Sequence, residues 1–408
     1  MSDEAAQKIP TGWHKVRFGG VARNVKVKVD RRDCKLDRYV AGEHMRTKDL
    51  RITEWGTIGE DYLGPAFNQK FVKGQILYGS RRTYLRKVAL ADFDGICANT
   101  TFVIEPKGID LMPELLPFIM QSDAFTEHSI KMSKGSVNPY INWKDIACYE
   151  FTVPPAERQF KIARIIQGAE NCLQRHEHLQ DEAEVLKRVL AKRLFTKGIN
   201  HKQFIDTEIG AFPRTWKAVR LEEVLELCQY GLSAKISDKG TYPIVKMDDL
   251  VNGVVVPDKI RYVDLDHTSF ENFRLEKRDI LFNRTNSLEL VGRTGIFLLD
   301  GDYVFASYLI RLRPKKESID PSYLVHYLIF SNDRLKPLAT RAVSQANINA
   351  TNLKNLKIQL PPILEQKEIA RILSTLDSAI SKIRQQIQIT KALKMKLITE
   401  LFTKGRNT

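Results

Sequence analysis

The sequence repeats itself at an interval of 207 residues, and no insertion interrupts the match over about 45 positions. The matching segments are Pro154-Pro155 and Pro361-Pro362, Ile162–Ile165 and Ile369–Ile372, and Leu194–Gly198 and Leu401–Gly405. Each copy closes one half of the chain. We therefore divide the chain into a first module (residues 1–153), a first arm (154–200), a second module (201–360) and a second arm (361–408).

Both arms have helical character over residues 157–197 and 364–404, because neither stretch contains a proline or dense clusters of β-branched residues. A proline pair precedes each stretch, and proline is tolerated before a helix or in its first turn but not inside it. Gly198 and Gly405 stand where a helix takes a left-handed C-terminal cap. About 41 residues at 1.5 Å rise make a helix of roughly 60 Å, longer than a small domain.

Apolar residues in both arms follow alternating steps of four and three, which is the spacing of a heptad seam. The predicted pairing residues are Ile165, Leu179, Leu186 and Leu190 in the first arm and Ile372, Leu376, Ile383, Leu393 and Leu397 in the second. An alternative is that each stripe docks only on its own module. Because two such long helices bury their stripes most economically against each other, we expect an antiparallel coiled coil that relates the two halves by a pseudo-twofold axis.

The two modules match each other more loosely than the arms do, but their landmarks occur in the same order. Alternating segments such as 101–104 and 295–299 lie between Gly, Asp and Asn residues and predict strands of a mixed sheet. Apolar stretches at 111–120 and 323–330 each follow an acid, have a proline close to their start and predict short helices. The predicted fold class is α+β, with two mixed α/β domains that alternate with the two long helices.

Each module carries two polar loops at matching places. One loop follows an Ile-Leu-aromatic strand, and the other precedes a repeated Ile-Asn pair at 141–142 and 348–349. Arg can fork onto guanine, Asn and Gln onto adenine, and Ser or Thr onto bases or phosphates, although ordinary solvated loops also have this composition. The candidate DNA-binding residues are Arg81, Arg82, Tyr84, Lys134, Ser136, Asn138 and Tyr140 in the first module and Arg284, Asn286, Arg293, Arg341, Ser344, Gln345 and Asn347 in the second.

The formal net charge of +15 and the pI near 9.4 favour a polyanionic partner, of which nucleic acid is the commonest. A basic surface kept for solubility is the alternative. The five cysteines form no Cys-x-x-Cys pair and have no zinc-finger spacing, so we expect reduced thiols and no metal site. No run approaches the roughly 18 apolar residues of a membrane span, and we expect a cytoplasmic protein without membrane contact.

The alternation of modules and arms resembles the specificity subunits of Type I restriction-modification systems. The resemblance covers nearly the whole chain and includes the pattern Gln-x-x-Ile-Ala-Arg-Ile at Gln159–Ile165 and Gln366–Ile372. It implies that each module reads one half of a split site in double-stranded DNA. The helices would set the spacer between the halves and dock two modification subunits. The modification and restriction subunits would carry S-adenosylmethionine, ATP and Mg²⁺, and this chain would hold no cofactor and no catalytic residue.

Two other functions remain open from the sequence. Glu105-Pro-Lys107 has the Glu-x-Lys form of many nucleases, with Asp92 or Asp94 upstream as a metal ligand. The corresponding tripeptide of the second module, Arg313-Pro-Lys315, has no carboxylate. The other function is that of a coiled-coil adaptor whose modules bind proteins. DNA binding that weakens as the salt concentration rises would argue against this adaptor function. No Gly-x-x-x-x-Gly-Lys-Ser/Thr motif occurs, so we expect no NTPase site.

Overall fold

The computed structural model describes residues 11–30, 35–60, 63–108, 110–338, 340–341 and 346–403. The chain forms two compact units, and the first consists of residues 1–176 and 386–408. The second consists of residues 177–385. The boundaries fall inside the arms, so each unit contains one module together with part of both arms.

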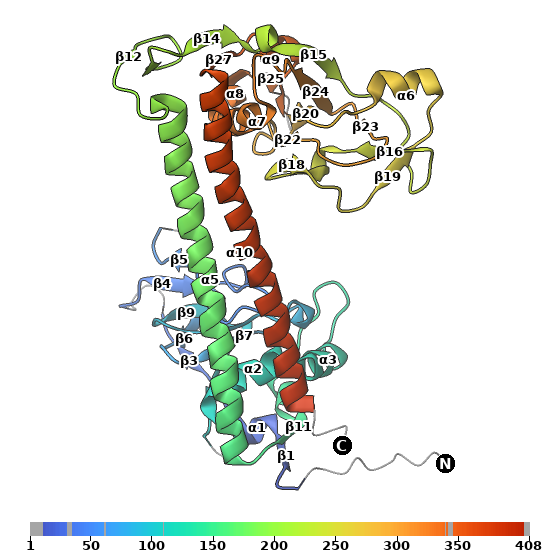
Figure 1. The fold of residues 1–408 in the computed structure, drawn as a ribbon. Helices are drawn as coiled ribbons and strands as arrows, with labels where there is room; N and C mark the ends of the chain where they lie inside the picture. The colour runs from blue at the N-terminus through green and yellow to red at the C-terminus, as the bar shows by residue number, and fades with distance from the viewer. Residues whose placement is uncertain are drawn as a thin grey trace. The chain divides into compact units, whose positions relative to one another are not determined.

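The two arms form the long helices α5 (Ala156–Lys197) and α10 (Ile363–Thr403), green and red in Figure 1. They confirm the helices that the sequence predicted. The Pro155 carbonyl accepts the first bonds of α5, from the N–H groups of Arg158 and Gln159. At the other end Gly198 donates to the Leu194 carbonyl with φ +62°, the left-handed conformation of a helix cap.

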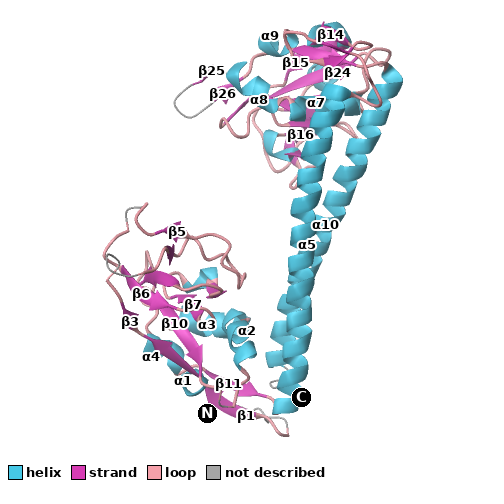
Figure 2. Cartoon of the chain, turned by 90° about the vertical axis from the view of Figure 1, so that its left-hand side faces the viewer, coloured by secondary structure: helices cyan, strands magenta, loops and turns pink. Residues whose placement is uncertain are grey.

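Within each unit α5 and α10 lie side by side (Figures 1 and 2). In the second unit Glu184 Oε1 lies 2.8 Å from Arg384 Nη2, and Lys187 pairs with Asp377. Residue numbers rise on one helix as they fall on the other, so this part of the pair is antiparallel. In the first unit Lys394 Nζ donates to Glu170 Oε2 at 2.6 Å.

The buried face of each arm lies one residue later along the helix than we predicted. Ile166, Glu170 and Leu173 are buried on α5, and Leu373, Ile380, Ile387 and Lys394 are buried on α10. Four predicted pairing residues are about half exposed: Ile165 at 49%, Leu179 at 48%, Leu186 at 54% and Leu393 at 51%. Leu190, Ile372, Leu376, Ile383 and Leu397 are partly buried at the margin of this face.

A shift of one residue turns a helix face by about 100°, which explains the correction. The buried face includes four charged positions: Glu170, Lys187, Asp377 and Lys394. A prediction based on apolar residues at heptad spacing excludes charged positions, and it therefore selects the neighbouring apolar stripe. The predicted pairing of Ile165, Leu179, Leu186 and Leu393 is therefore wrong.

The first module is built on two sheets and a short ribbon. The ribbon pairs β1 (His14–Arg17) with β11 (Glu150–Val153), and one sheet has the order β2 (Ala22–Val25), β10 (Thr101–Pro106), β7 (Ile76–Gly79), β8 (Val88–Leu90). The other has the order β3 (Val27–Lys28), β6 (Phe67–Phe71), β9 (Gly95–Ala98), β4 (Arg38–Val40), β5 (Gly56–Thr57). The helices are α1 (Phe18–Val21), α2 (Leu116–Gln121), α3 (Asp123–Lys131), α4 (Trp143–Ala147) and the 3₁₀ turns η1 (Thr83–Leu85) and η2 (Pro113–Leu115).

The second module repeats this plan with more strands. Its six-stranded sheet has the order β15 (Leu225–Tyr230), β24 (Leu309–Pro314), β20 (Ile280–Asn283), β22 (Thr294–Ile296), β18 (Gly253–Val255), β17 (Leu250–Val251). Smaller sheets are β19 (Arg261–Val263), β16 (Tyr242–Val245), β23 (Val304–Phe305); β21 (Thr285–Asn286), β26 (Ala346–Asn347), β25 (Thr340–Arg341); β12 (Phe204–Ile205), β13 (Phe212–Pro213); and β14 (Lys217–Arg220), β27 (Lys357–Leu360). The helices are α6 (His267–Phe273), α7 (Pro321–Phe330), α8 (Asn332–Leu335), α9 (Ala350–Lys354) and the 3₁₀ turns η3 (Leu221–Val224), η4 (Met247–Asp249) and η5 (Lys336–Leu338). The predicted α+β class is confirmed.

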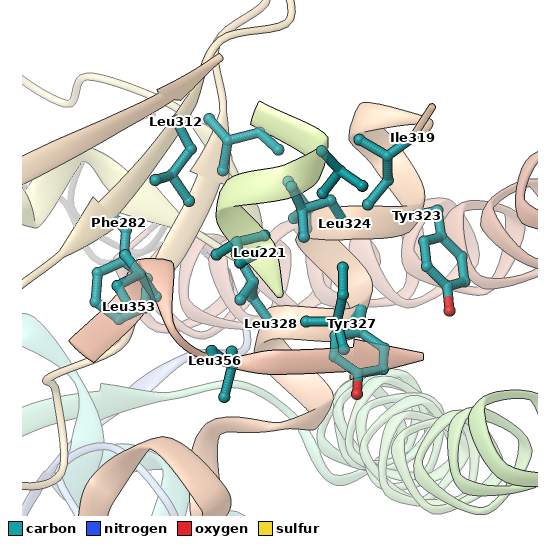
Figure 3. Packing of buried hydrophobic residues seen from close by; sticks show 14 of the residues in the cluster. Leu221, Phe282, Leu312, Ile319, Tyr323, Leu324, Tyr327, Leu328, Leu353 and Leu356 are labelled. Carbon is teal, nitrogen blue, oxygen red and sulfur yellow. The ribbon is translucent and has the colours of Figure 1, made fainter. Parts of the chain in front are cut away.

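Helix α7 occupies the centre of the second module's core. Asp320 caps it by accepting the N–H groups of Ser322 and Tyr323, and Pro321 takes the first helical position. Figure 3 shows its apolar side chains among those of the sheet and of the turn around Leu356. Phe195 of α5 enters the same core, with ring centroids 5.5 Å from Tyr323 and 5.4 Å from Tyr327. The end of the first arm is therefore anchored in the module that follows it.

The described residues also show the state of four cysteines, the grouping of metal-ligating side chains and the length of apolar helices. Cys97, Cys148, Cys172 and Cys228 are free thiols, and Cys34 lies outside the described residues. Among the residues that the structure describes, no three His, Cys, Asp or Glu side chains gather in a way that could hold a metal ion. No helix in the described ranges is both long and apolar enough to cross a bilayer.

Candidate nucleic-acid interface

The two predicted loops of the first module are joined to each other by backbone hydrogen bonds. Lys134 and Tyr140 exchange two N–H···O bonds of 2.8 and 2.9 Å, which close residues 134–140 into a hairpin. Arg82 donates its N–H to the Pro139 carbonyl at 2.7 Å, and Ile141 donates to the Ser80 carbonyl at 2.9 Å. Two segments that are far apart in the sequence thus form one surface.

The predicted side chains of this surface are open to solvent. Tyr84 is 52% exposed and Tyr140 42%. The other five, Arg81, Arg82, Lys134, Ser136 and Asn138, are also exposed. Arg82 has φ +50°, a conformation that costs energy for a residue with a side chain and that is found often at functional sites. Cations, amides and aromatic rings are therefore all available to an external ligand.

One arginine of the same stretch is held inside the protein. The Nη1 of Arg86 donates to Asp123 Oδ1 at 2.5 Å, and this bond holds the pKa of the Asp123 carboxyl below its usual value. The side chain of Arg86 is only 17% exposed. It therefore braces η1 against α3, whereas Arg81 and Arg82 remain accessible.

In the second module the predicted loops lie on neighbouring strands. Thr285 pairs with Asn347 and Asn286 pairs with Ala346, so β21 and β26 are adjacent, and β25 follows on the other side of β26. Only the backbone of Arg341 is described, and Ser344 and Gln345 lie outside the described residues. The structure therefore brings together Asn286, Asn347 and the backbone of Arg341.

The two modules use the same backbone frame at this place. The frame consists of two hydrogen bonds on a residue that follows the Ile-Leu-aromatic strand. Its N–H donates to a carbonyl at the start of the next long strand, and its own carbonyl accepts from the Ile of the repeated Ile-Asn pair. The bonds are Ser80 N to Thr100 O (3.1 Å) and Ile141 N to Ser80 O (2.9 Å) in the first module, and Arg284 N to Tyr308 O (3.0 Å) and Ile348 N to Arg284 O (2.9 Å) in the second.

Side chains on this constant frame differ between the modules. Ser80 of the first module corresponds to Arg284 of the second, Thr100 to Tyr308, and Tyr140 to Asn347. These replacements change size, charge and hydrogen-bonding capacity together. A constant backbone with different side chains is the arrangement expected where two surfaces recognise different ligands of one class.

Arg284 is held by contacts within the second module and orients a neighbouring amide. Its Nε donates to the Ser307 carbonyl at 2.9 Å, and its Nη1 donates to Asn347 Oδ1 at 3.2 Å. The guanidinium carbon also lies 4.9 Å from the centre of the Tyr230 ring. Since Arg284 occupies the Asn347 oxygen, the NH₂ group of Asn347 is fixed in direction.

Of the other predicted residues of the second module, one is engaged inside the protein and one is exposed. Asn286 donates to Met247 Sδ at 3.4 Å and accepts from the Ser287 N–H at 2.8 Å, so its amide is engaged inside the protein. Arg293 is exposed. Asn347 and Arg293 are therefore better placed to contact a ligand than Arg284 and Asn286.

Sequence reasoning missed residues that a neighbouring strand brings to this surface. In the first module an open pocket of about 540 Å³ is lined by residues that include Lys26, Asn99 and Trp143 as well as Arg81 and Tyr140. Lys26 follows Val25, the last paired residue of β2, and Tyr230, which contacts Arg284, ends the corresponding strand β15. Both lie more than 50 residues from the polar loops in the sequence. Only their position at or just past the ends of strands β2 and β15 could have signalled them.

The nuclease candidates are engaged in contacts within the first module. Glu105 accepts hydrogen bonds from Gln75 Nε2 at 2.7 Å and Arg23 Nε at 2.8 Å, and these bonds hold its pKa below the usual value. The ammonium group of Lys107 donates to the Gly19 carbonyl at 2.6 Å, and Asp94 accepts the Lys73 N–H. Each of these three groups is therefore paired within the module, and among the described residues no three His, Cys, Asp or Glu side chains gather as a metal site.

Comparison with known proteins finds one family that matches most of the chain. The family model of the Type I restriction modification DNA specificity domain matches residues 10–185 and again residues 213–391. The chain is 27% identical over 419 residues to the type I restriction enzyme MjaVIII specificity subunit of Methanocaldococcus jannaschii, covering 97% of this chain and 93% of that protein. A shorter match, 38% identical over 209 residues, covers 50% of this chain and 49% of the MjaX subunit of the same organism.

Solved structures show the same fold. A chain from a structure of type I R-M system assembly and conformational transition has a TM-score of 0.59 at 21% identity, covering 97% of this chain and 98% of that one. The Type-I restriction-modification S subunit from M. genitalium has a TM-score of 0.58 at 13% identity and covers 98% of both chains. Since the family model matches most of the chain in two successive copies, this chain belongs to the family of Type I restriction-modification DNA specificity subunits.

Proposed function

We propose that this chain reads a bipartite site in double-stranded DNA as the non-catalytic specificity subunit of a Type I restriction-modification enzyme. The observation that supports the proposal most strongly is the frame around Ser80 and Arg284, which is the same in both modules and carries different side chains. One subunit with two such surfaces can read two different half-sites. The net charge of +15 suits a polyanionic ligand.

Each surface combines residues for the DNA backbone with residues for the bases. In the first module Arg81, Arg82 and Lys134 supply positive charge for phosphates, which fix position without reading sequence. Asn138 and Tyr140, which are exposed at the tip and edge of the hairpin, would contact base edges. In the second module Asn347, fixed by Arg284, has the base-reading role and Arg293 contacts either a base or a phosphate.

The arms would measure the distance between the half-sites. We propose that α5 and α10 form an antiparallel coiled coil that relates the two halves by a pseudo-twofold axis. The ion pairs between the two helices in each unit support this arrangement. The number of residues between the modules would then set the length of the unread spacer.

Leu179 and Leu186, which we expected to pair the arms, would instead dock the modification subunits together with Val185 and Val189. Leu179, Val185, Leu186 and Val189 of α5 are 48%, 50%, 54% and 62% exposed, which makes an apolar strip on an otherwise charged helix. Apolar surface of this kind marks a site of protein association. Two modification subunits would bind here, and restriction subunits would join that assembly. S-adenosylmethionine, ATP and Mg²⁺ would be held by those partners.

A pair of substitutions tests whether each module reads its own half-site. Asn347→Ala is expected to reduce discrimination at one base position of one half-site by about 1–3 kcal/mol and to leave the other half-site unaffected. Tyr140→Ala, at the corresponding position of the first module, is the matched control and should affect only the opposite half. The measurement is competition binding of the assembled modification enzyme to duplexes with single base changes in either half. Equal weakening at both halves by either variant would rule out modular reading.

A further inference from the structure

Two ion pairs that join α5 to α10, one in each unit, have side chains less than a quarter exposed, whereas the Glu184–Arg384 pair of the second unit is more open to solvent. In the first unit Glu170 and Lys394 meet at 2.6 Å with side chains only 7% and 4% exposed. In the second unit Lys187 and Asp377 meet with side chains 24% and 23% exposed. These charges lie in the seam between the helices and not on the outer surface.

The two ion pairs are copies of each other under the sequence repeat. Glu170 and Asp377 are 207 residues apart, and so are Lys187 and Lys394. The acid of the first arm binds the lysine of the second arm, and the acid of the second arm binds the lysine of the first. This reciprocity is the pattern of a self-complementary, twofold interface, although here it lies within one chain.

Each ion pair also lies against the module of its own unit. Lys394 Nζ is 5.9 Å from the centre of the Phe118 ring on α2. His326 on α7 lies 3.7 Å from Asp377 Oδ2, and its Nε2 is 3.0 Å from Ser374 Oγ. Phe118 and His326 hold corresponding places, five residues after Pro113 and Pro321. Each pair therefore connects both arms at the place where a module packs on them.

We propose that Glu170–Lys394 and Lys187–Asp377 lock the register of α5 against α10, and thereby set the spacer that the enzyme accepts between its half-sites. This inference rests on the proposed function. A buried charge without its partner is strongly unfavourable, whereas apolar seam residues can pack in several registers. Buried polar residues serve as register markers in other coiled coils for the same reason.

The sequence shows which residues would face these four charges if one helix slid along the other. A shift of one heptad in either direction would set Lys187 opposite Ala370 or Arg384 and Glu170 opposite Ile387 or Leu401. Of the two lysines, only Lys394 would meet an acid, Glu177, and in only one of the two directions. Neither alternative register pairs the remaining charges, so the observed register is specified from both ends.

Two variants separate a register lock from a merely stabilising contact. The apolar variant carries Glu170→Leu, Lys394→Met, Lys187→Met and Asp377→Leu, since apolar replacement of a complete buried ion pair is often neutral or stabilising. The matched control carries the reversed charges, Glu170→Lys with Lys394→Glu and Lys187→Asp with Asp377→Lys, and keeps the complementarity. If the apolar variant does not fold, Lys187→Met with Asp377→Leu at the less buried pair takes its place, and thermal unfolding of each protein shows which comparison applies.

The readout is the affinity of the assembled enzyme for duplexes that keep both half-sites and change the spacer by one or two base pairs. The wild type and the reversed-charge control are expected to prefer one spacer by about tenfold or more. The apolar variant should bind that duplex as well but lose the preference to within about twofold. An apolar variant with the wild-type preference would overturn the lock. A wild-type enzyme indifferent to the half-sites themselves would instead overturn the proposed function.

Discussion

Replacing Leu173 with Ala is expected to lower the free energy of unfolding by about 2–5 kcal/mol, whereas Leu179→Ala should change it by less than about 0.5 kcal/mol. Leu173 is 3% exposed and follows Glu170 on the buried face of α5, but Leu179 is 48% exposed. Truncation at the first position leaves a cavity, and truncation at the second removes only solvated surface. Denaturant unfolding of the isolated chain measures both values.

The two substitutions control for each other. They make the same chemical change six residues apart on one helix, so any effect of helix propensity is the same for both. Leu179→Ala should in addition weaken binding of the modification subunits, because it removes part of their proposed docking strip. Equal losses of stability, or a larger loss for Leu179→Ala, would mean that the helices pair through the apolar stripe predicted from the sequence.

Acidification from pH 6.5 to pH 4 is expected to cost the second unit about 3 kcal/mol of stability through His326 alone. Burial of this side chain lowers its pKa from 6.5 to about 4. Above pH 6.5 the ring is neutral in the folded and unfolded chains, so its contribution does not change. Below pH 6.5 the unfolded chain takes up a proton that the folded chain resists, and stability falls until the folded pKa is reached.

His326→Phe is the matched variant for this prediction, because Phe118 holds the corresponding position in the first module. Carboxyl groups also titrate in this range, so the informative quantity is the difference between wild type and variant. Denaturant unfolding at intervals between pH 4 and 7 should show a steeper loss for the wild type. Parallel curves would mean that His326 is already protonated in the folded protein or is accessible to water.

The arms and the class of the modules could be predicted because they depend on local signals. Proline pairs and Gly198 mark the ends of α5, and the repeat makes the second arm a copy of the first. The seam could not be predicted from apolar spacing, because Glu170 and Lys394 are stabilised inside it by each other and not by hydrophobicity. Each residue read alone looks like a solvated charge, and the partner that makes its burial possible is more than 200 residues away.

The loops of the candidate interface could be predicted from the sequence, but the roles of their individual side chains could not. Arg81, Lys134 and Tyr140 lie on one exposed surface, as their composition suggested for a ligand site. Arg284 and Asn286 are residues of the same polar kinds, yet both make hydrogen bonds inside the second module. Which polar side chain braces a loop and which contacts a ligand depends on tertiary neighbours such as Ser307, Tyr230 and Met247, and no local pattern encodes these.

Mapping of methylated adenines in a host genome tests the central claim most directly, namely that one chain reads two half-sites with two modules. Three strains are compared: one with this gene, one without it and one that carries Asn347→Ala. The expected result is a two-part motif with a constant spacer that disappears without the gene, and whose degeneracy increases in only one half in the variant strain. A methylation map that does not change when the gene is removed, or a single continuous motif, would contradict the claim.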